Sequence, residues 1–410
     1  MLKRISVDHL RLGMHLHELC GSWMDHPFWR SKFVLRDPAD LARIRDSGIT
    51  EVWINTAKGL DVEGGVSQEQ AALEVERELV VALQAAPASP ESEPPAHQPA
   101  GQSASAICNQ ARDKVQSLFT EARMGKAVDV DGCAPLVEAI IGSVESDPGA
   151  LLSLVRLKSK DEYTYLHSVA VCALMVALAR TLKLPDTEVR KLGLAGMLHD
   201  MGKARIPLPV LNKPGRLTDA EFALMRRHPQ WGYDLLVEGQ VDCAVTLDVC
   251  LHHHEKIDGS GYPEALADKH ISLPARMGAI CDVYDAVTSA RAYKQAWDPG
   301  EAIRQMAQWK GHFDPVVFQA FVKTVGIYPV GTLIKLQSGR LAVVIEQGSR
   351  SLLMPRVKVF FSTKSMLPIT PEIVDLGHPA CQDKLLGVEA PDAWKFKNLE
   401  SLWIDEILTR

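Results

Sequence analysis

The chain has 410 residues, of which 46% are hydrophobic, enough for two or three domains with substantial cores. Its formal net charge of −6 excludes the broad positive surface of a protein that coats DNA or anionic lipid, so we expect no DNA partner and only local phosphate binding. The eight cysteines are scattered without CxxC spacing, which excludes a small secreted domain stapled by disulfides.

Neither export nor membrane insertion is predicted. The first eight residues include basic side chains, but no apolar region of the kind found in a signal peptide follows them. The longest apolar stretch, residues 169–179, is shorter than the ~20 residues that a membrane-spanning helix needs. We therefore expect a buried helix at this stretch, no membrane span, and a cytoplasmic location.

The N-terminal residues 1–70 predict a small α+β accessory domain. Short apolar alternations, such as the one at 51–54, are separated by turn residues at Gly13, Pro27 and Gly48. Residues 85–106 are dominated by proline, alanine, serine and glutamate, and such a segment cannot bury enough apolar surface to offset its ordering entropy. We expect a disordered linker over 85–106.

Helical periodicity dominates the middle of the chain. Thr218 and Glu221 form a capping-box pattern, and apolar residues recur at three- and four-residue spacing in 107–124, 134–144, 163–182 and 186–198. This predicts a helical lead-in at 107–150 and a helical bundle at 151–325. Beyond residue 326, two alternating apolar segments flank Ser338-Gly339, which predicts a hairpin within a β-rich C-terminal extension at 326–410. The expected fold class is mainly α, with small β-containing regions at both ends.

One adjacent pair, His199-Asp200, ends the apolar helix predicted at 186–198. An imidazole nitrogen and a carboxylate oxygen suit divalent cations, and a carboxylate has two oxygens with which to bridge two metals. In isolation the pair has a plainer interpretation, in which His199 favours the helix dipole and Asp200 makes a turn. Its companions decide in favour of a metal site.

Those companions are histidines and an aspartate in apolar surroundings. His167 lies within an apolar helix, and an unpaired Asp282 among apolar neighbours would be costly to bury. The adjacent His253 and His254 can serve one site only near a helix end, because successive helical side chains point about 100° apart. Taken alone, His228 and each of the other residues could equally have a purely structural role. Together they predict a metal centre.

These residues resemble one known family. The motifs, in chain order over about residues 150–325, are His167, His199-Asp200-Met201-Gly202-Lys203, His228, His253-His254-Glu255, Asp258-Gly259-Ser260-Gly261-Tyr262-Pro263 and Asp282. The string resembles the HD-GYP family, a branch of the HD-domain phosphohydrolases. The resemblance implies a helical-bundle HD-GYP domain that hydrolyses cyclic di-GMP to pGpG and on to GMP, using two or three iron or manganese ions.

The resemblance also implies the ligand sets. One metal would be held by His167, His199, Asp200 and Asp282, and the other by Asp200, His228, His253 and His254. Family members with a third metal carry a glutamate four residues before the first histidine, whereas this chain has Tyr163 there and Glu162 one step away. We therefore predict two divalent metal ions, with a third still possible through Glu162.

Further residues are assigned to catalysis and substrate binding by the same resemblance. Asp200 and Lys203 would be the catalytic residues, and Lys203, Arg291 and Lys294 would pair with phosphate oxygens. As exposed helix residues these three cations would be unremarkable. Tyr262 would shape the substrate pocket or dock a partner. Relatives commonly have aspartate and proline where this chain has Ala290 and Ala292, so the loop that holds Arg291 and Lys294 is expected to be looser.

Two alternative functions remain open from the sequence. One is a catalytically weak cyclic di-GMP sensor or adaptor that acts through protein partners, although all the predicted ligands are present. The other is a different HD phosphohydrolase that acts on nucleotides or linear oligonucleotides, which the loop containing Tyr262 disfavours. By family analogy, diguanylate cyclases with GGDEF domains are expected partners, and a homodimer is also considered.

Overall fold

A computed structural model of the chain describes residues 1–20, 32–47, 49–68, 70–71, 74–75, 77, 103–147, 149, 151, 163–215, 217–289, 296–348, 351–394, 396 and 398–408. The chain divides into two compact units. One consists of Met1–Pro87 with Arg304–His312, and the other of Ala88–Ile303 with Phe313–Arg410. Most of the predicted linker lies outside the described residues.

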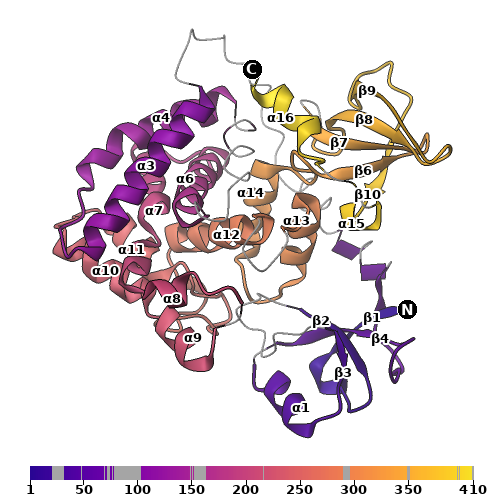
Figure 1. Cartoon of the computed structure of the whole chain (residues 1–410), viewed down its shortest axis with the longest axis horizontal. Coiled ribbons are helices and arrows are strands. Elements are labelled where there is room, and N and C mark those ends of the chain that lie inside the picture. Colours follow the sequence, from indigo (N-terminus) through magenta and orange to yellow (C-terminus); the bar gives the residue numbers. More distant parts are fainter. Residues whose placement is uncertain are drawn as a thin grey trace. The chain divides into compact units, whose positions relative to one another are not determined.

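The first unit is built around a five-stranded antiparallel sheet of order β3-β2-β4-β1-β5 (Figure 1). Its strands are β1 (Leu2–Ser6), β2 (His15–Leu19), β3 (Phe33–Val34), β4 (Glu51–Asn55) and β5 (Val66–Ser67). Helix α1 (Pro38–Arg45) begins where the Asp37 side chain accepts a hydrogen bond from the Ala39 amide. Alternate residues of the strands, including Leu16, Val52 and Ile54, are buried with Ile44 of α1. This α+β architecture agrees with the sequence prediction.

The second unit begins with helices and carries the histidine motifs. Its helices are α3 (Ala104–Arg123), α4 (Ala134–Ser146), α6 (Tyr163–Thr181), α7 (Asp186–Leu198), α8 (Leu208–Leu211), α9 (Asp219–Met225), α10 (His228–Glu238), α11 (Ala244–His252), α12 (Leu273–Thr288) and α14 (Pro315–Val325). Helix α13 (Pro299–Gln308) spans the division between the units. The mainly α fold class is confirmed, and α9 has the predicted capping box between Thr218 and Glu221. Helix α3 starts earlier than expected because Ser103 caps it, so the last residues of the predicted linker are helical.

Helix α6 is the central helix of this unit. It packs against α3, α4, α7, α12 and α14, and Figure 1 shows it surrounded by other helices. By length and composition its Thr164–Thr181 window could cross a membrane, but 78% of that window is buried within the structure. The buried position explains why apolar residues surround the helix on all sides rather than forming one stripe.

A second antiparallel sheet, of order β10-β6-β7-β8-β9, follows the helices. Its strands are β6 (Leu333–Leu336), β7 (Arg340–Glu346), β8 (Arg356–Ser362), β9 (Leu367–Asp375) and β10 (Leu385–Val388). The predicted Ser338-Gly339 turn joins β6 to β7, with Gly339 at a φ of 81° that glycine adopts without strain. The short helices α15 (Pro391–Trp394) and α16 (Ser401–Leu408) follow, and Trp403 of α16 packs into the core of the sheet.

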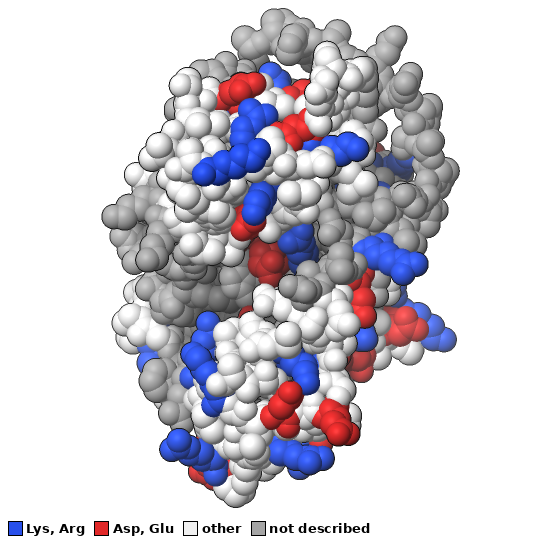
Figure 2. Space-filling view, turned by 90° about the vertical axis from the view of Figure 1, so that its right-hand side faces the viewer, with Lys and Arg blue, Asp and Glu red and all other residues white. Residues whose placement is uncertain are grey.

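Charged side chains on the described surface are mixed in sign. Figure 2 shows lysine and arginine side chains interspersed with aspartate and glutamate over one face of the molecule. Many of the cations are paired, as Arg205 is with Glu238 and Arg276 with Asp314. On the face that Figure 2 shows, charge therefore occurs in small local groups.

Candidate metal centre

Five helices bring the predicted metal ligands to one place in the second unit. His167 lies within α6, His199 ends α7 and is followed by Asp200, and His228 is the first residue of α10. His253 ends α11, as its position beside His254 required, and Asp282 lies in the middle of α12. All seven side chains belong to buried residues with at most 9% of their surface exposed: His167, His199, Asp200, His228, His253, His254 and Asp282.

One half of the centre joins α6, α7 and α12. The His167 Nε2 atom lies 2.9 Å from Asp282 Oδ1 and 3.5 Å from Asp200 Oδ2. The His199 Nε2 atom lies 3.4 Å from the same Asp200 Oδ2 and 3.9 Å from Asp282 Oδ1. Two imidazole nitrogens and two carboxylates therefore face one another.

The other half joins α10 and α11 to the second oxygen of the same aspartate. Asp200 Oδ1 lies 3.3 Å from His228 Nε2 and 3.8 Å from His253 Nε2, and these two nitrogens are 3.2 Å apart. The His254 Nδ1 atom lies 3.7 Å from Asp282 Oδ2. Asp200 thus directs one oxygen toward each half, which is the geometry that a bridging carboxylate requires.

Three sets of potential ligand atoms meet the distances of a metal site. They are His167, His199 and Asp282; His199, Asp200 and His253; and His228, His253 and His254, with the atoms of each set within 4.8 Å of one another. The His199 Nε2 and Asp200 Oδ1 atoms are buried, and although each lies within 3.4 Å of a neighbouring ligand atom, neither has a partner with hydrogen-bond geometry among the described residues. Because unsatisfied buried polar atoms are costly, and because these point into a cluster of nitrogen and oxygen ligands, the residues fit divalent cations.

The histidine rings are oriented by hydrogen bonds on their outer side. The Nδ1 atoms of His199 and His228 lie 2.8 Å from the carbonyl oxygens of Gly196 and Met225, respectively. His253 Nδ1 lies 3.0 Å from two carbonyl oxygens of its own helix. Because a carbonyl only accepts, Nδ1 must donate, which leaves the Nε2 lone pair directed into the centre.

Protonation favours metal ligation as well. Burial lowers the pKa of His253 to about 3, and burial next to His253 holds the pKa of His254 well below its usual value, so both imidazoles are neutral near pH 7. Burial alone would raise the pKa of Asp200, but Lys203 and His199 outweigh it and hold that pKa well below the usual range. Burial also lowers the pKa of His228, whereas Asp200 and Asp282 outweigh burial and raise the pKa of His199. The half of the centre formed by His228, His253 and His254 therefore presents neutral imidazoles beside an ionised Asp200.

Asp285 contacts a predicted ligand, although the motifs did not single it out. Its Oδ2 atom lies 2.6 Å from His167 Nδ1, and it is 2% exposed. It performs for His167 the role that backbone carbonyls perform for the other histidines. The available signal was a second carboxylate three residues after Asp282 on the same apolar helix, which places both on one side of α12.

Lys203 lies beside the centre, in the 3₁₀ turn η4 (Met201–Arg205). Its ammonium group forms an ion pair with Asp200, and 21% of its side chain is exposed. Arg123 of α3, also not predicted, donates to the carbonyl oxygens of Lys203 and Ile206 and so attaches the lead-in helix to this turn. Gly202 is required here, since an added Cβ would lie 1.8 Å from the carbonyl oxygen of His228.

Tyr262 lies next to the centre because its ring stacks on the side chain of His254. Its ring is stacked on His254 with centroids 4.8 Å apart, and the guanidinium of Arg226 lies 4.4 Å from the Tyr262 centroid. The Arg226 guanidinium and the His254 imidazole thus both contact the Tyr262 ring, and the three side chains form one group beside the centre. Glu255 holds the same loop, accepting hydrogen bonds from the Glu264 and Leu266 amides.

Several predicted residues lie outside the described part of the chain. Arg291 and Lys294, with Ala290 and Ala292 beside them, belong to the segment 290–295 that the structure does not describe. Glu162 is also outside, and nothing is described of the Tyr163 side chain. The assignment of Arg291 and Lys294 to substrate binding and the question of a third metal stay predictions.

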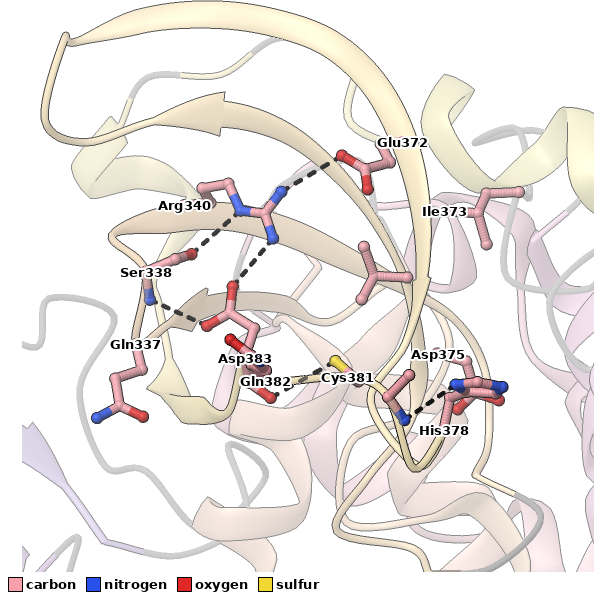
Figure 3. Close-up of a pocket in the computed structure, with 12 residues that line it drawn as sticks. Gln337, Ser338, Arg340, Glu372, Ile373, Asp375, His378, Cys381, Gln382 and Asp383 are labelled. Carbon is pink, nitrogen blue, oxygen red and sulfur yellow. Dashed lines mark hydrogen bonds and ion pairs between the residues drawn. The ribbon is translucent and has the colours of Figure 1, made fainter.

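A separate hollow of about 780 Å³ lies on the C-terminal sheet (Figure 3). Arg340 reaches into it, and its guanidinium bonds to Ser338, Glu372 and Asp383. Asp383 also accepts the Ser338 amide. The Arg340 cation is thus already neutralised by its neighbours, and the hollow shares no residue with the histidine centre.

The fold and the histidine-aspartate centre define the chain as an HD-domain protein. A model described as "HD domain" matches residues 148–317, and one described as "Domain of unknown function (DUF3391)" matches residues 2–133. Cyclic di-GMP phosphodiesterase PA4108 of Pseudomonas aeruginosa is 56% identical over 404 residues, which cover 98% of this chain and 96% of the relative. The chain therefore belongs to the HD-GYP family of metal-dependent phosphodiesterases, which confirms the family resemblance.

Other relatives match part of the chain. The response regulator RpfG of Xanthomonas campestris, a cyclic di-GMP phosphodiesterase, is 45% identical over 148 residues, 36% of this chain and 39% of RpfG. 3'3'-cGAMP-specific phosphodiesterase 1 of Vibrio cholerae is 35% identical over 193 residues, 46% of this chain and 44% of the relative. Among solved structures, Bd1817, an HD-GYP-type protein of Bdellovibrio bacteriovorus, is 18% identical with a TM-score of 0.47, covering 79% of this chain and 99% of that one.

Proposed function

We propose that the chain hydrolyses cyclic di-GMP to pGpG, and pGpG on to GMP, at a centre that holds two cations. The observation that carries the proposal is Asp200, whose two oxygens face two separate groups of buried ligands. The high identity to a cyclic di-GMP phosphodiesterase over nearly the whole chain supports the choice of substrate.

Each cation would have its own set of ligands. His167, His199 and Asp282 would hold one, His228, His253 and His254 the other, and Asp200 would contribute an oxygen to both. When bound, the cations would supply Lewis-acid activation of the phosphate and of the attacking water at neutral pH. Mixed imidazole and carboxylate ligands suit iron or manganese, which are the ions we propose. A third cation depends on Glu162.

The protein's own residues would orient and stabilise the reacting groups. Asp200, held ionised by the adjacent Lys203, fixes the position of both halves of the centre. Lys203 is the partly exposed cation nearest to Asp200 among the described side chains, so it is suited to stabilise charge that develops on the phosphate oxygens. Tyr262, stacked on His254, would shape the edge of the pocket. Arg291 and Lys294 are proposed as further phosphate contacts from the family resemblance.

The sensor or adaptor alternative predicts binding without turnover. Loss of catalysis in such a protein would normally follow loss of ligands, whereas this chain retains all seven in one buried cluster. Diguanylate cyclase partners, a homodimer and a cytoplasmic location remain hypotheses from family analogy.

The decisive experiment measures metal content and products together. The protein is purified without oxygen, its iron and manganese are quantified, and the products formed from cyclic di-GMP and from 3'3'-cGAMP are separated by chromatography. We expect about two metal ions per chain and formation of pGpG followed by GMP, with cyclic di-GMP preferred. Binding of cyclic di-GMP without turnover by the metal-loaded protein would establish the sensor instead.

A further inference from the structure

Arg226 occupies an unusual position beside the metal centre. It caps the C-terminal end of α9 and precedes His228 by two residues, so it is tied to one of the metal ligands through the backbone. Its guanidinium lies over the ring of Tyr262, and its side chain is exposed. In the part of the chain that the structure describes, no carboxylate lies within ion-pair distance of Arg226, whereas Arg205 is paired with Glu238.

Stacking leaves the hydrogen-bonding edge of this guanidinium available. The guanidinium carbon of Arg226 lies over the Tyr262 ring, and a guanidinium that stacks on a ring through its face keeps its N–H groups available in its own plane. Stacking also limits the rotation of a long side chain, so less entropy is lost when it binds an anion. An arginine fixed in this way is a preorganised site for a phosphate, which it can contact through two parallel hydrogen bonds.

The substrate of the proposed reaction carries a second phosphate, which cannot lie at the metal centre while the first one does. A cyclic dinucleotide has two phosphodiester groups on opposite sides of its macrocycle. When one lies at the cations, the other must lie some distance away, beyond the side chains that border the centre. Arg226 is not one of the clustered ligands, but it contacts Tyr262, which itself is stacked on the ligand His254.

We propose that Arg226 binds the second, non-scissile phosphate of the cyclic dinucleotide, an assignment that rests on the proposed function. Tyr262 is then a positioning residue, because its ring contacts both His254 and Arg226 and so holds the guanidinium close to the metal ligand His254. Arg226 contributes to substrate affinity and leaves the chemical step unchanged.

The test compares a substrate that has two phosphodiesters with one that has a single phosphodiester. Arg226→Ala should raise the KM for cyclic di-GMP about tenfold or more, the usual effect of removing a charge-assisted hydrogen bond, with kcat little changed. Hydrolysis of bis(p-nitrophenyl) phosphate, which has no second phosphate, should keep its kcat/KM within about twofold of the unaltered chain. Arg226→Lys, which keeps the charge but loses the planar fork, should give an intermediate KM.

Arg227 is the matched control, because it is the next residue and also stacks on an aromatic ring, that of Trp231 at 4.7 Å. Arg227→Ala should leave both activities unchanged. An unaltered KM for cyclic di-GMP in Arg226→Ala, or an equal loss with both substrates, would overturn the role of Arg226. Failure of the unaltered, metal-loaded chain to hydrolyse cyclic di-GMP would refute the proposed function itself, so the two failures are distinguishable.

Discussion

The histidine centre and the hollow on the C-terminal sheet are both lined by polar side chains, but their hydrogen bonding differs. In the hollow, Arg340 and Asp383 satisfy each other and their neighbours, as Figure 3 shows. In the centre, His199 Nε2 and Asp200 Oδ1 are buried without a hydrogen-bond partner among the described residues, while the outer nitrogens of the histidines are bound. In a ligand site, the outer polar atoms of the side chains are hydrogen-bonded, whereas the inner ones are left for the ligand. This pattern indicates a ligand site more clearly than the volume of a hollow does.

Removing the shared aspartate should have the largest effect. Asp200→Ala takes one oxygen from each half of the centre, so we expect loss of most bound metal and of turnover of cyclic di-GMP, measured by metal analysis and product chromatography. Asp383→Ala is the control from the hollow and should keep both. An active Asp200→Ala protein with full metal content would contradict the bridging role.

Lys203 should matter for turnover and not for metal binding. Lys203→Ala removes a cation next to the reacting phosphate, and we expect kcat to fall by about 10²–10³-fold, the usual cost of losing one group that stabilises developing charge. Metal content should be unchanged, because bound cations would themselves keep Asp200 ionised after the lysine is removed. Lys191 forms a pair with Glu188 at the same three-residue spacing, so Lys191→Ala is the control and should behave like the unaltered chain.

Asp285 should act on metal affinity through His167. Asp285→Asn weakens the hydrogen bond that orients the imidazole, and we expect metal affinity to fall by about 10–100-fold in competition with a chelator. Asp375→Asn, a substitution of the same kind at the hollow, should leave affinity unchanged. Equal affinities in the two variants would show that His167 does not need its outer partner.

The smallest effect is expected in the hollow itself. Arg340→Ala removes partly exposed ion pairs, which contribute about 1 kcal/mol at most, so the thermal midpoint should fall by only a few degrees. Turnover of cyclic di-GMP should be unaffected. A large loss of activity would mean that the C-terminal sheet takes part in catalysis together with the histidine centre.

The sequence predicted the elements that depend on local patterns. Helix α7 has the predicted bounds, and the Ser338-Gly339 turn joins two strands as expected. Both predictions succeeded because helical periodicity and turn preference depend on residues that are close together in the sequence. The predicted ligands were singled out for a similar reason, since histidines and aspartates in apolar helices are costly without partners, and the structure brings these residues together. Family resemblance then supplied the grouping of these ligands around two cations.

Contacts between residues far apart in the sequence were not predicted. Arg123 supports Lys203 from 80 residues away, and Asp285 supports His167 from 118 residues away, so no local pattern connects them. The stack of Arg226, Tyr262 and His254 also joins separate segments. These partners are set by how helices pack against one another, which a single sequence does not specify residue by residue.

The outer hydrogen bonds of the histidines have a consequence for metal exchange. His199, His228 and His253 are fixed by carbonyl groups no more than four residues away, so their rings keep their direction as long as each helix end is intact. His167 alone of the four depends on a side chain from another helix. A cation of a different radius would therefore be accommodated chiefly by shifts of the carboxylates and of His167, on the side of the centre formed by α6 and α12.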